Sequence, residues 1–255
     1  MFEDSNRIRF ERPVDQNGRR WWTRRFFDPF GLTPEGMGDL ITKSAAGEKS
    51  IIYHYIDGIG EKFALRVEGR FYDGASIWFV ERTLELQGRF FNADEMFIPD
   101  IDAGFGRGRL LMKDLIDAGR TIEIERIKIQ AQNIGRYARL RMGFVPDEGS
   151  WRSIQADGTR FIQLYEKRLG TRFVTDLTRQ ILSGRPETAV FLAGLSQPVP
   201  SRQLFDREGR PLDVPLGKAI FLEGCGNWTG EFDLKDPDVL KIADDYARSI
   251  GDGHG

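Results

Sequence analysis

The sequence predicts an α/β protein of the α+β type, in which helices flank a mixed, mainly antiparallel sheet. Four strand-like segments follow one another with only short turns between them, at residues 50–56, 62–71, 76–86 and 89–98. After Pro99 the pattern changes to a glycine-rich loop, a helix, a strand and a second helix. Tight turns join antiparallel strands and helical crossovers join parallel ones, so both pairings are expected in one sheet.

The segment before the strands has the signals of a helix start. Thr33 is a suitable N-cap, Pro34 suits the first helical position, and Glu35 lies near the positive end of the helix dipole. The helix is predicted to end by Gly47. The turns after it contain Gly or Asp-Gly, which favours hairpins and an antiparallel meander.

Composition indicates a folded chain without a strong electrostatic preference. With 255 residues, 40% hydrophobic and 30% charged, it can bury one large core or one core with a smaller appendage. The net charge of −2 implies no overall attraction to nucleic acid or acidic lipid. A signal-peptide pattern and a spanning apolar run are both absent from the sequence, so we expect a cytoplasmic location and no membrane partner. Cys225 is the single cysteine, which excludes an intrachain disulfide.

Residues 1–32 form a predicted N-terminal arm that is rich in arginine and aromatic residues. Arg19-Arg20-Trp21-Trp22 and Arg24-Arg25-Phe26-Phe27 follow neither a helical nor a strand period. Such a segment can stack on bases and grip phosphates, or it can pack its rings on a sheet edge. The slightly acidic chain favours packing, so a nucleic-acid partner is not expected.

Residues 151–255 are predicted to form a mostly helical C-terminal extension beyond a core at 33–150. Helical patterns lie at 160–169, 175–182, 187–195 and 237–250, with a short strand at 219–222 and a proline-rich linker at 197–201. Such an extension can serve as a partner surface, a lid or a substrate domain. A protein partner or self-association through 151–255 is therefore expected.

The chemistry is expected at the glycine-rich loop that opens the helix predicted at 107–118. Gly104, Gly106 and Gly108 alternate before an apolar helical pattern, so N–H groups at the helix start can be open to a ligand. A pyrophosphate suits this place, because the helix dipole favours an anion and glycine allows close approach. Tight turns and helix packing are the alternative uses of such glycines. A Walker loop is excluded, because no Gly-Lys-Ser/Thr follows.

The loop and its surroundings resemble the GNAT acyltransferase superfamily. Its acyl-CoA loop runs Arg/Gln-x-x-Gly-x-Gly/Ala into a helix with Leu-Leu, and this chain has Ala103-Gly104-Phe105-Gly106-Arg107-Gly108-Arg109-Leu110-Leu111. Ile98-Pro99 resembles the strand that enters the loop, and Asn133 and Met142-Gly143-Phe144 resemble the later helix and its closing Gly-Phe. The resemblance implies acetyl-CoA or another acyl-CoA as cofactor, bound by Ile98, Gly104, Phe105, Gly106, Arg107, Gly108, Arg109 and Asn133.

Two positions depart from the family pattern. Ala103 stands where the family has Arg or Gln, and Arg107 or Arg109 can supply the missing cation or can simply be solvated helix residues. Leu140 stands where the family has the tyrosine that protonates the leaving thiolate. Tyr137 lies one turn earlier on the same helix face and can take that role, or it can pack its ring against the sheet.

Acyl transfer to an amine also needs a general base. Glu95, on the strand that leads into the loop, is the predicted base, with Asp94 and Glu85 as substitutes; each can also be a solvent-facing strand residue. Direct attack by the amine requires no nucleophilic side chain, so Cys225 is not needed. His54 is predicted to pack within a strand rather than to bind metal.

The leading hypothesis is an acyl-CoA-dependent N-acyltransferase that transfers an acetyl or acyl group directly to an amine. The acceptor is expected to be an amine-bearing small molecule or protein. The alternative is a catalytically inactive GNAT-like module that binds or supports a larger assembly, which Ala103 and Leu140 favour.

Overall fold

The protein, seen in a computed structural model, comprises two compact units. The described residues are 1–45, 47–70, 77–99, 106–169 and 181–248. The first unit consists of Met1–Ile129, Asp233–Leu240 and Ala247–Gly255, and the second of Gln130–Phe232 and Lys241–Tyr246. The boundaries of these units differ from the predicted division after residues 32 and 150.

The first unit contains a mixed, mainly antiparallel sheet with the strand order β1-β2-β3-β4-β5-β6. The strands are β1 Ile8–Phe10, β2 Lys49–Asp57, β3 Lys62–Arg70, β4 Ile77–Glu85, β5 Phe90–Phe97 and β6 Arg126–Ala131. β2 to β5 form an antiparallel meander, whereas β1 pairs with β2 and β5 pairs with β6 in parallel. The predicted fold class and the predicted meander are confirmed.

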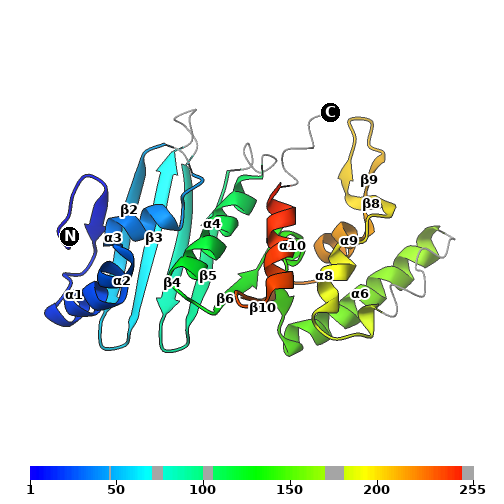
Figure 1. The fold of residues 1–255 in the computed structure, drawn as a ribbon. Helices are drawn as coiled ribbons and strands as arrows, with labels where there is room; N and C mark the ends of the chain where they lie inside the picture. Colours follow the sequence, from blue (N-terminus) through cyan, green and yellow to red (C-terminus); the bar gives the residue numbers. More distant parts are fainter. Residues whose placement is uncertain (46, 71–76, 100–105, 170–180, 249–255) are drawn as a thin grey trace. The chain divides into compact units, whose positions relative to one another are not determined.

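Helices of the first unit lie over one face of this sheet (Figure 1). They are α1 Gln16–Trp22, the π-helical turn η1 Thr23–Phe27, α2 Asp28–Phe30, α3 Pro34–Leu40 and α4 Arg107–Thr121. Alternate residues of the strands point to the helices and are buried, such as Trp78, Val80 and Leu84 of β4. The opposite face of the sheet carries the intervening polar and aromatic side chains.

The arginine- and aromatic-rich N-terminal segment belongs to the core of this unit. Trp21, Trp22 and Phe26 are buried. The Trp22 ring centroid lies 5.6 Å from that of Tyr53 and 5.2 Å from that of Phe63, and its indole N–H donates to the Leu32 carbonyl at 2.9 Å. The rings therefore pack against the sheet. They lie in the helical elements α1 and η1, although the sequence of this segment has no clear helical period.

The start of α3 agrees with its prediction from the sequence, whereas the end of α4 does not. Thr33 caps α3 as predicted, accepting a hydrogen bond from the Gly36 amide at 3.0 Å. The helix predicted at 107–118 continues further than expected, as α4 ends at Thr121 and includes Gly119. A Cβ added at Gly119 would lie 2.7 Å from Leu234 Cδ1, so close packing explains this glycine.

Asp114 of α4 fixes the turn that follows α3. The amide and the hydroxyl group of Ser44 both donate to Asp114 Oδ2, at 2.7 and 2.5 Å. We expect Asp114→Ala to lower the free energy of unfolding by about 1–3 kcal/mol, because it leaves the Ser44 donors without this acceptor. Urea unfolding should show this loss, whereas Asp117→Ala, which removes a half-exposed ion pair with Lys113, should cost about 0.5 kcal/mol or less. Equal losses in the two variants would contradict this role.

The second unit is mostly helical, with short strands. Its elements are α5 Gly135–Arg141, β7 Val145–Pro146, α6 Glu148–Leu169, α8 Thr188–Ala193, β8 Pro198–Phe205, β9 Pro211–Pro215, α9 Leu216–Ala219, η3 Ile220–Gly224 and β10 Trp228–Asp233. The residues of the terminal helix α10 Pro237–Arg248 are divided between the two units. Asp236 caps this helix, because its Oδ1 accepts from the amides of Asp238 and Val239. β10 pairs with β7, and β8 pairs with β9, both antiparallel.

Three predictions in the C-terminal third fail or fall outside the described residues. The predicted linker at 197–201 is the start of β8, where the prolines are tolerated because the sheet has only two strands and both are edges. The predicted strand at 219–222 is helical, as the end of α9 and the start of η3. Most of the predicted helix at 175–182 lies outside the described residues.

Candidate functional site

The start of α4 is the described part of the glycine-rich loop. Gly104 and Phe105 lie outside the described residues, whereas Gly106 is the N-cap residue, with φ 71° and ψ 6°. This left-handed conformation suits glycine, because a side chain would be strained there. Gly108, in the first turn, packs close to the sheet, since a Cβ at this position would lie 3.1 Å from Ile98 Cδ1.

The first backbone amides of α4, before Arg109, make no helical hydrogen bond among the described residues. The helical ladder begins with the amides of Arg109 and Leu110, which both donate to the Gly106 carbonyl, at 3.0 and 3.2 Å. Among the described residues, no side chain caps this end. Arg107 and Arg109, in the same turn, add positive charge to the positive end of the helix dipole. The helix start therefore has the features of an anion site.

Strand β5 leaves its parallel neighbour before it reaches the loop. Its pairing with β6 runs from Phe90 to Ala93, whereas its pairing with β4 continues to Phe97. Within the described part of the chain, the stretch from Asp94 to Phe97 thus pairs on one side only. An unpaired strand edge can hydrogen-bond an extended ligand. Ile98, at the end of this edge, lies beside Gly108.

A β-bulge shapes the same stretch of β5. Between the pairs Glu81–Glu95 and Thr83–Asn92, β4 has one residue, Arg82, and β5 has two. Arg82 is buried, and its Nη1 donates to the carbonyl oxygens of Glu81 and Glu95, at 2.7 and 2.8 Å. The guanidinium group therefore holds the two strands together across the bulge.

The bulge turns Asp94 onto the same face of the sheet as Thr83. Thr83 Oγ1 donates to Asp94 Oδ2 at 2.7 Å. Partial loss of water around its carboxyl group raises the pKa of Asp94, and the Thr83 hydrogen bond offsets part of that rise. A carboxyl group with a raised pKa suits proton abstraction near neutral pH. Asp94 and Glu95, the predicted base, are both exposed residues, and Glu95 lies opposite Glu81 on β4.

Tyr55 of β2 lies on the same face of the sheet as Thr83 and Asp94. Tyr55, Ala64, Thr83 and Asn92 are consecutive partners across β2, β3, β4 and β5. Ala64 is small, so the Tyr55 ring can extend over β3 to Thr83. Burial raises the pKa of Tyr55, and the nearby carboxylates of Glu85 and Asp94 raise it further. Sequence reasoning missed Tyr55, Arg82 and Thr83, because only strand register and the bulge bring them to Asp94.

The predicted helix that carries Asn133 and Tyr137 lies in the second unit. Asn133 precedes α5 in a left-handed conformation, with φ 49°, which asparagine tolerates. Asn133 therefore lies two residues before the helix that the resemblance assigns it to. Tyr137 lies within α5, and Arg141 Nη1 donates to its hydroxyl oxygen at 3.5 Å. Its role as a proton donor stays a prediction.

Cys225 is a buried thiol. Burial raises its pKa to about 12, with a further contribution from the charge of Asp157. Because only a thiolate is a good nucleophile, we expect native Cys225 to react with Ellman's reagent at pH 8 roughly a thousandfold more slowly than in guanidinium-unfolded protein. Comparable rates in the two states would show that the thiol is accessible and ionised.

Two further findings bear on the kind of site. Among the residues that the structure describes, no three side chains of the metal-binding types come together as a metal-ion site. His54 lies in β2, as predicted, and its Nδ1 is 2.9 Å from Glu11 Oε2. No helix in the described ranges is both long and apolar enough to cross a membrane.

Comparisons with known proteins give one structural likeness. No family model matches the chain, and no curated protein matches it. A crystal structure of nourseothricin acetyltransferase is similar over 34% of this chain and 51% of that chain, with 21% sequence identity and a TM-score of 0.29. This chain thus spans about half the length of that protein.

Proposed function

We propose that the first unit binds an acyl-CoA and that the protein transfers the acyl group to an amine. The observation that carries this proposal is the adjacency of two features, the uncapped start of α4 and the one-sided edge of β5, which meet where Gly108 packs on Ile98. The helix start suits the pyrophosphate, and the strand edge suits the amide groups of the pantetheine arm.

Gly106, Arg107, Gly108 and Arg109 are the proposed pyrophosphate contacts. The backbone of Gly106 allows the close approach of phosphate oxygens, and the arginine side chains supply the charge that Ala103 does not. Gly108 serves the helix packing as well, because a larger residue would push α4 away from β5. Gly104, Phe105, Ile98 and Asn133 remain contacts predicted from the resemblance to the GNAT superfamily.

Asp94, rather than Glu95, is the general base in this proposal. Thr83 orients its carboxyl group, and Arg82 fixes the bulge on which it lies. Asp94 takes a proton from the acceptor amine, whose nitrogen attacks the thioester carbonyl carbon. The C–N bond forms as the C–S bond breaks, and the coenzyme A thiolate leaves and takes up a proton. Tyr137 remains the sequence-based candidate for the donor of that proton.

Calorimetric titration with acetyl-CoA tests the binding step. The wild-type protein is expected to bind, and Gly106→Glu to weaken binding by at least about a hundredfold, because a carboxylate at the anion site repels the pyrophosphate. Gly31→Glu is the matched control: its φ of 67° is close to that of Gly106, it lies in the same unit, and no atom lies within 4 Å of an added Cβ. A wild-type protein that gives no heat, or equal affinities in the two variants, would overturn the proposal.

Thiol release separates catalysis from binding alone. An acyltransferase releases coenzyme A from acetyl-CoA in proportion to the acceptor amine, whereas an inactive module binds acetyl-CoA without any release that depends on an amine. A panel of small amines and peptides serves as acceptors, with free thiol as the readout.

A further inference from the structure

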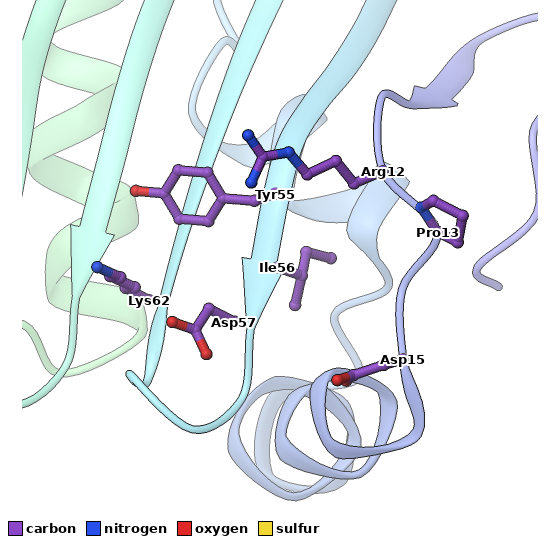
Figure 2. A pocket seen from close by; sticks show the side chains of 7 residues that line it. All are labelled: Arg12, Pro13, Asp15, Tyr55, Ile56, Asp57 and Lys62. Carbon is purple, nitrogen blue, oxygen red and sulfur yellow. The ribbon is translucent and has the colours of Figure 1, made fainter.

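A hollow of the first unit lies at the β2 end of the row that leads to Asp94. It has a volume of about 410 Å³ and is lined by Arg12, Tyr55, Asp57 and Lys62, among others (Figure 2). This volume lies within the usual range of small-molecule sites. The elements that line it are the segment after β1 and the strands β2 and β3.

Two cations of the hollow are available to a ligand. Arg12 and Lys62 have no carboxylate within ion-pair distance among the described residues. Figure 2 shows the Tyr55 ring between the Arg12 guanidinium and the Lys62 ammonium group, and Lys62 Nζ is 6.0 Å from the ring centroid. An anionic group placed here would meet a charge on each side and an aromatic surface between them.

The two acidic residues of the hollow are engaged in holding the backbone. Asp15 Oδ1 accepts from the Gly18 amide at 2.7 Å, and Asp57 Oδ1 accepts from the amides of Ile59 and Gly60, at 3.0 and 2.9 Å. These hydrogen bonds stabilise two turns. The formal charges of the two aspartates and the two cations sum to zero, so an anion is held here only by direct contact with Arg12 or Lys62.

The strand register sets the distance from the hollow to the proposed base. Tyr55 on β2 and Thr83 on β4 are separated by Ala64 on β3, so they are two strand spacings apart. Two spacings amount to about 10 Å. Thr83 in turn donates to Asp94. Because the Tyr55 ring covers Ala64, a ligand stacked on the outer face of this ring would extend from the Arg12 side of the hollow, at β2, to the carboxyl group of Asp94 (Figure 2).

We propose that this hollow binds the anionic end of the acyl acceptor, so that the acceptor is an elongated amine whose carboxylate lies about 10 Å from its nucleophilic nitrogen. This inference rests on the proposed function, because it takes Asp94 as the base. An extended tripeptide has this separation, since each residue spans up to about 3.5 Å. Arg12 and Lys62 bind the carboxylate, and the amine lies at Asp94.

Calorimetric titration with triglycine, triglycinamide and glycine tests the proposal on the full chain. Triglycine is expected to bind at least about tenfold more tightly than triglycinamide, which lacks the carboxylate, and glycine is too short to span the site. Arg12→Gln and Lys62→Gln should each weaken triglycine binding about tenfold and remove the preference over the amide. Arg20→Gln and Lys43→Gln, exposed sites of the same unit, are matched charge controls and should leave affinity unchanged.

The possible outcomes separate this inference from the proposed function. If triglycine does not bind, or binds no more tightly than triglycinamide, the assignment of the hollow is overturned. The proposed function is unaffected by that result as long as acetyl-CoA binds. If acetyl-CoA does not bind, the proposed function is overturned. The effects of Arg12→Gln and Lys62→Gln on triglycine binding would then still show whether the hollow binds a carboxylate. Melting temperatures equal to the wild-type value would show that the variants are folded.

Discussion

Replacing Asp94 by asparagine is expected to lower kcat for acyl transfer by about 10²- to 10⁴-fold, while the affinity for acetyl-CoA stays within about twofold. Asparagine has nearly the same shape and can still accept the Thr83 hydrogen bond, but it cannot take a proton at neutral pH. Release of coenzyme A at saturating acetyl-CoA measures kcat, and calorimetry measures affinity. Glu95→Gln, one residue along the strand, is the matched control and is expected to change kcat by less than about tenfold.

The pH dependence gives this prediction a second readout. The pKa of Asp94 is raised, so the wild-type kcat should fall as the pH drops through that raised value, and Asp94→Asn should lack this acidic limb. A carboxyl group whose folded pKa is raised binds its proton more tightly when folded, so its ionised form costs stability above that pKa. The melting temperature of Asp94→Asn at neutral pH should therefore equal or exceed that of the wild type. A lower melting temperature together with lost activity would indicate a structural role instead.

Replacing Trp22 by alanine is expected to lower the free energy of unfolding by about 3–5 kcal/mol. Trp22 is fully buried, contacts four other aromatic rings, and donates to the Leu32 carbonyl. Its removal leaves a large cavity and an unpaired carbonyl group. Urea unfolding followed by circular dichroism measures the change.

Phe27→Ala is the matched control for this cavity. Phe27 is in the same segment, but its side chain is 40% exposed, so its loss should cost about 1 kcal/mol or less. A Trp22→Ala variant as stable as Phe27→Ala would contradict the place of Trp22 in the core of the first unit.

Local patterns in the sequence predict much of the first unit. The four strands of the meander lie within about one residue of their predicted bounds, because alternation and Gly-containing turns are local signals. The cap at Thr33 is also a local signal, since its side chain accepts from an amide three residues later. The sequence does not predict the N-terminal helices, because Trp22 and Phe26 take their places by packing on the distant rings of Tyr53 and Phe63.

The candidate site depends on long-range features that sequence patterns do not contain. The glycine pattern indicates an anion site at Gly106, but the bulge that presents Asp94 arises from one extra residue in β5 relative to β4. Neither strand shows this in its own alternation. Likewise, Tyr55 and Thr83 are neighbours only through the register across Ala64. The sequence therefore favours Glu95 by its place near the loop, whereas geometry favours Asp94.

Titration of the full chain with acetyl-CoA, followed by ¹H–¹⁵N NMR, locates the ligand directly. If the first unit binds acetyl-CoA as proposed, the largest shift changes occur at the amides of Gly106 to Leu110, at the start of α4, and of Asp94 to Ile98, along the one-sided edge of β5. Saturable changes confined to other parts of the chain, or no changes at millimolar acetyl-CoA, would contradict this proposal.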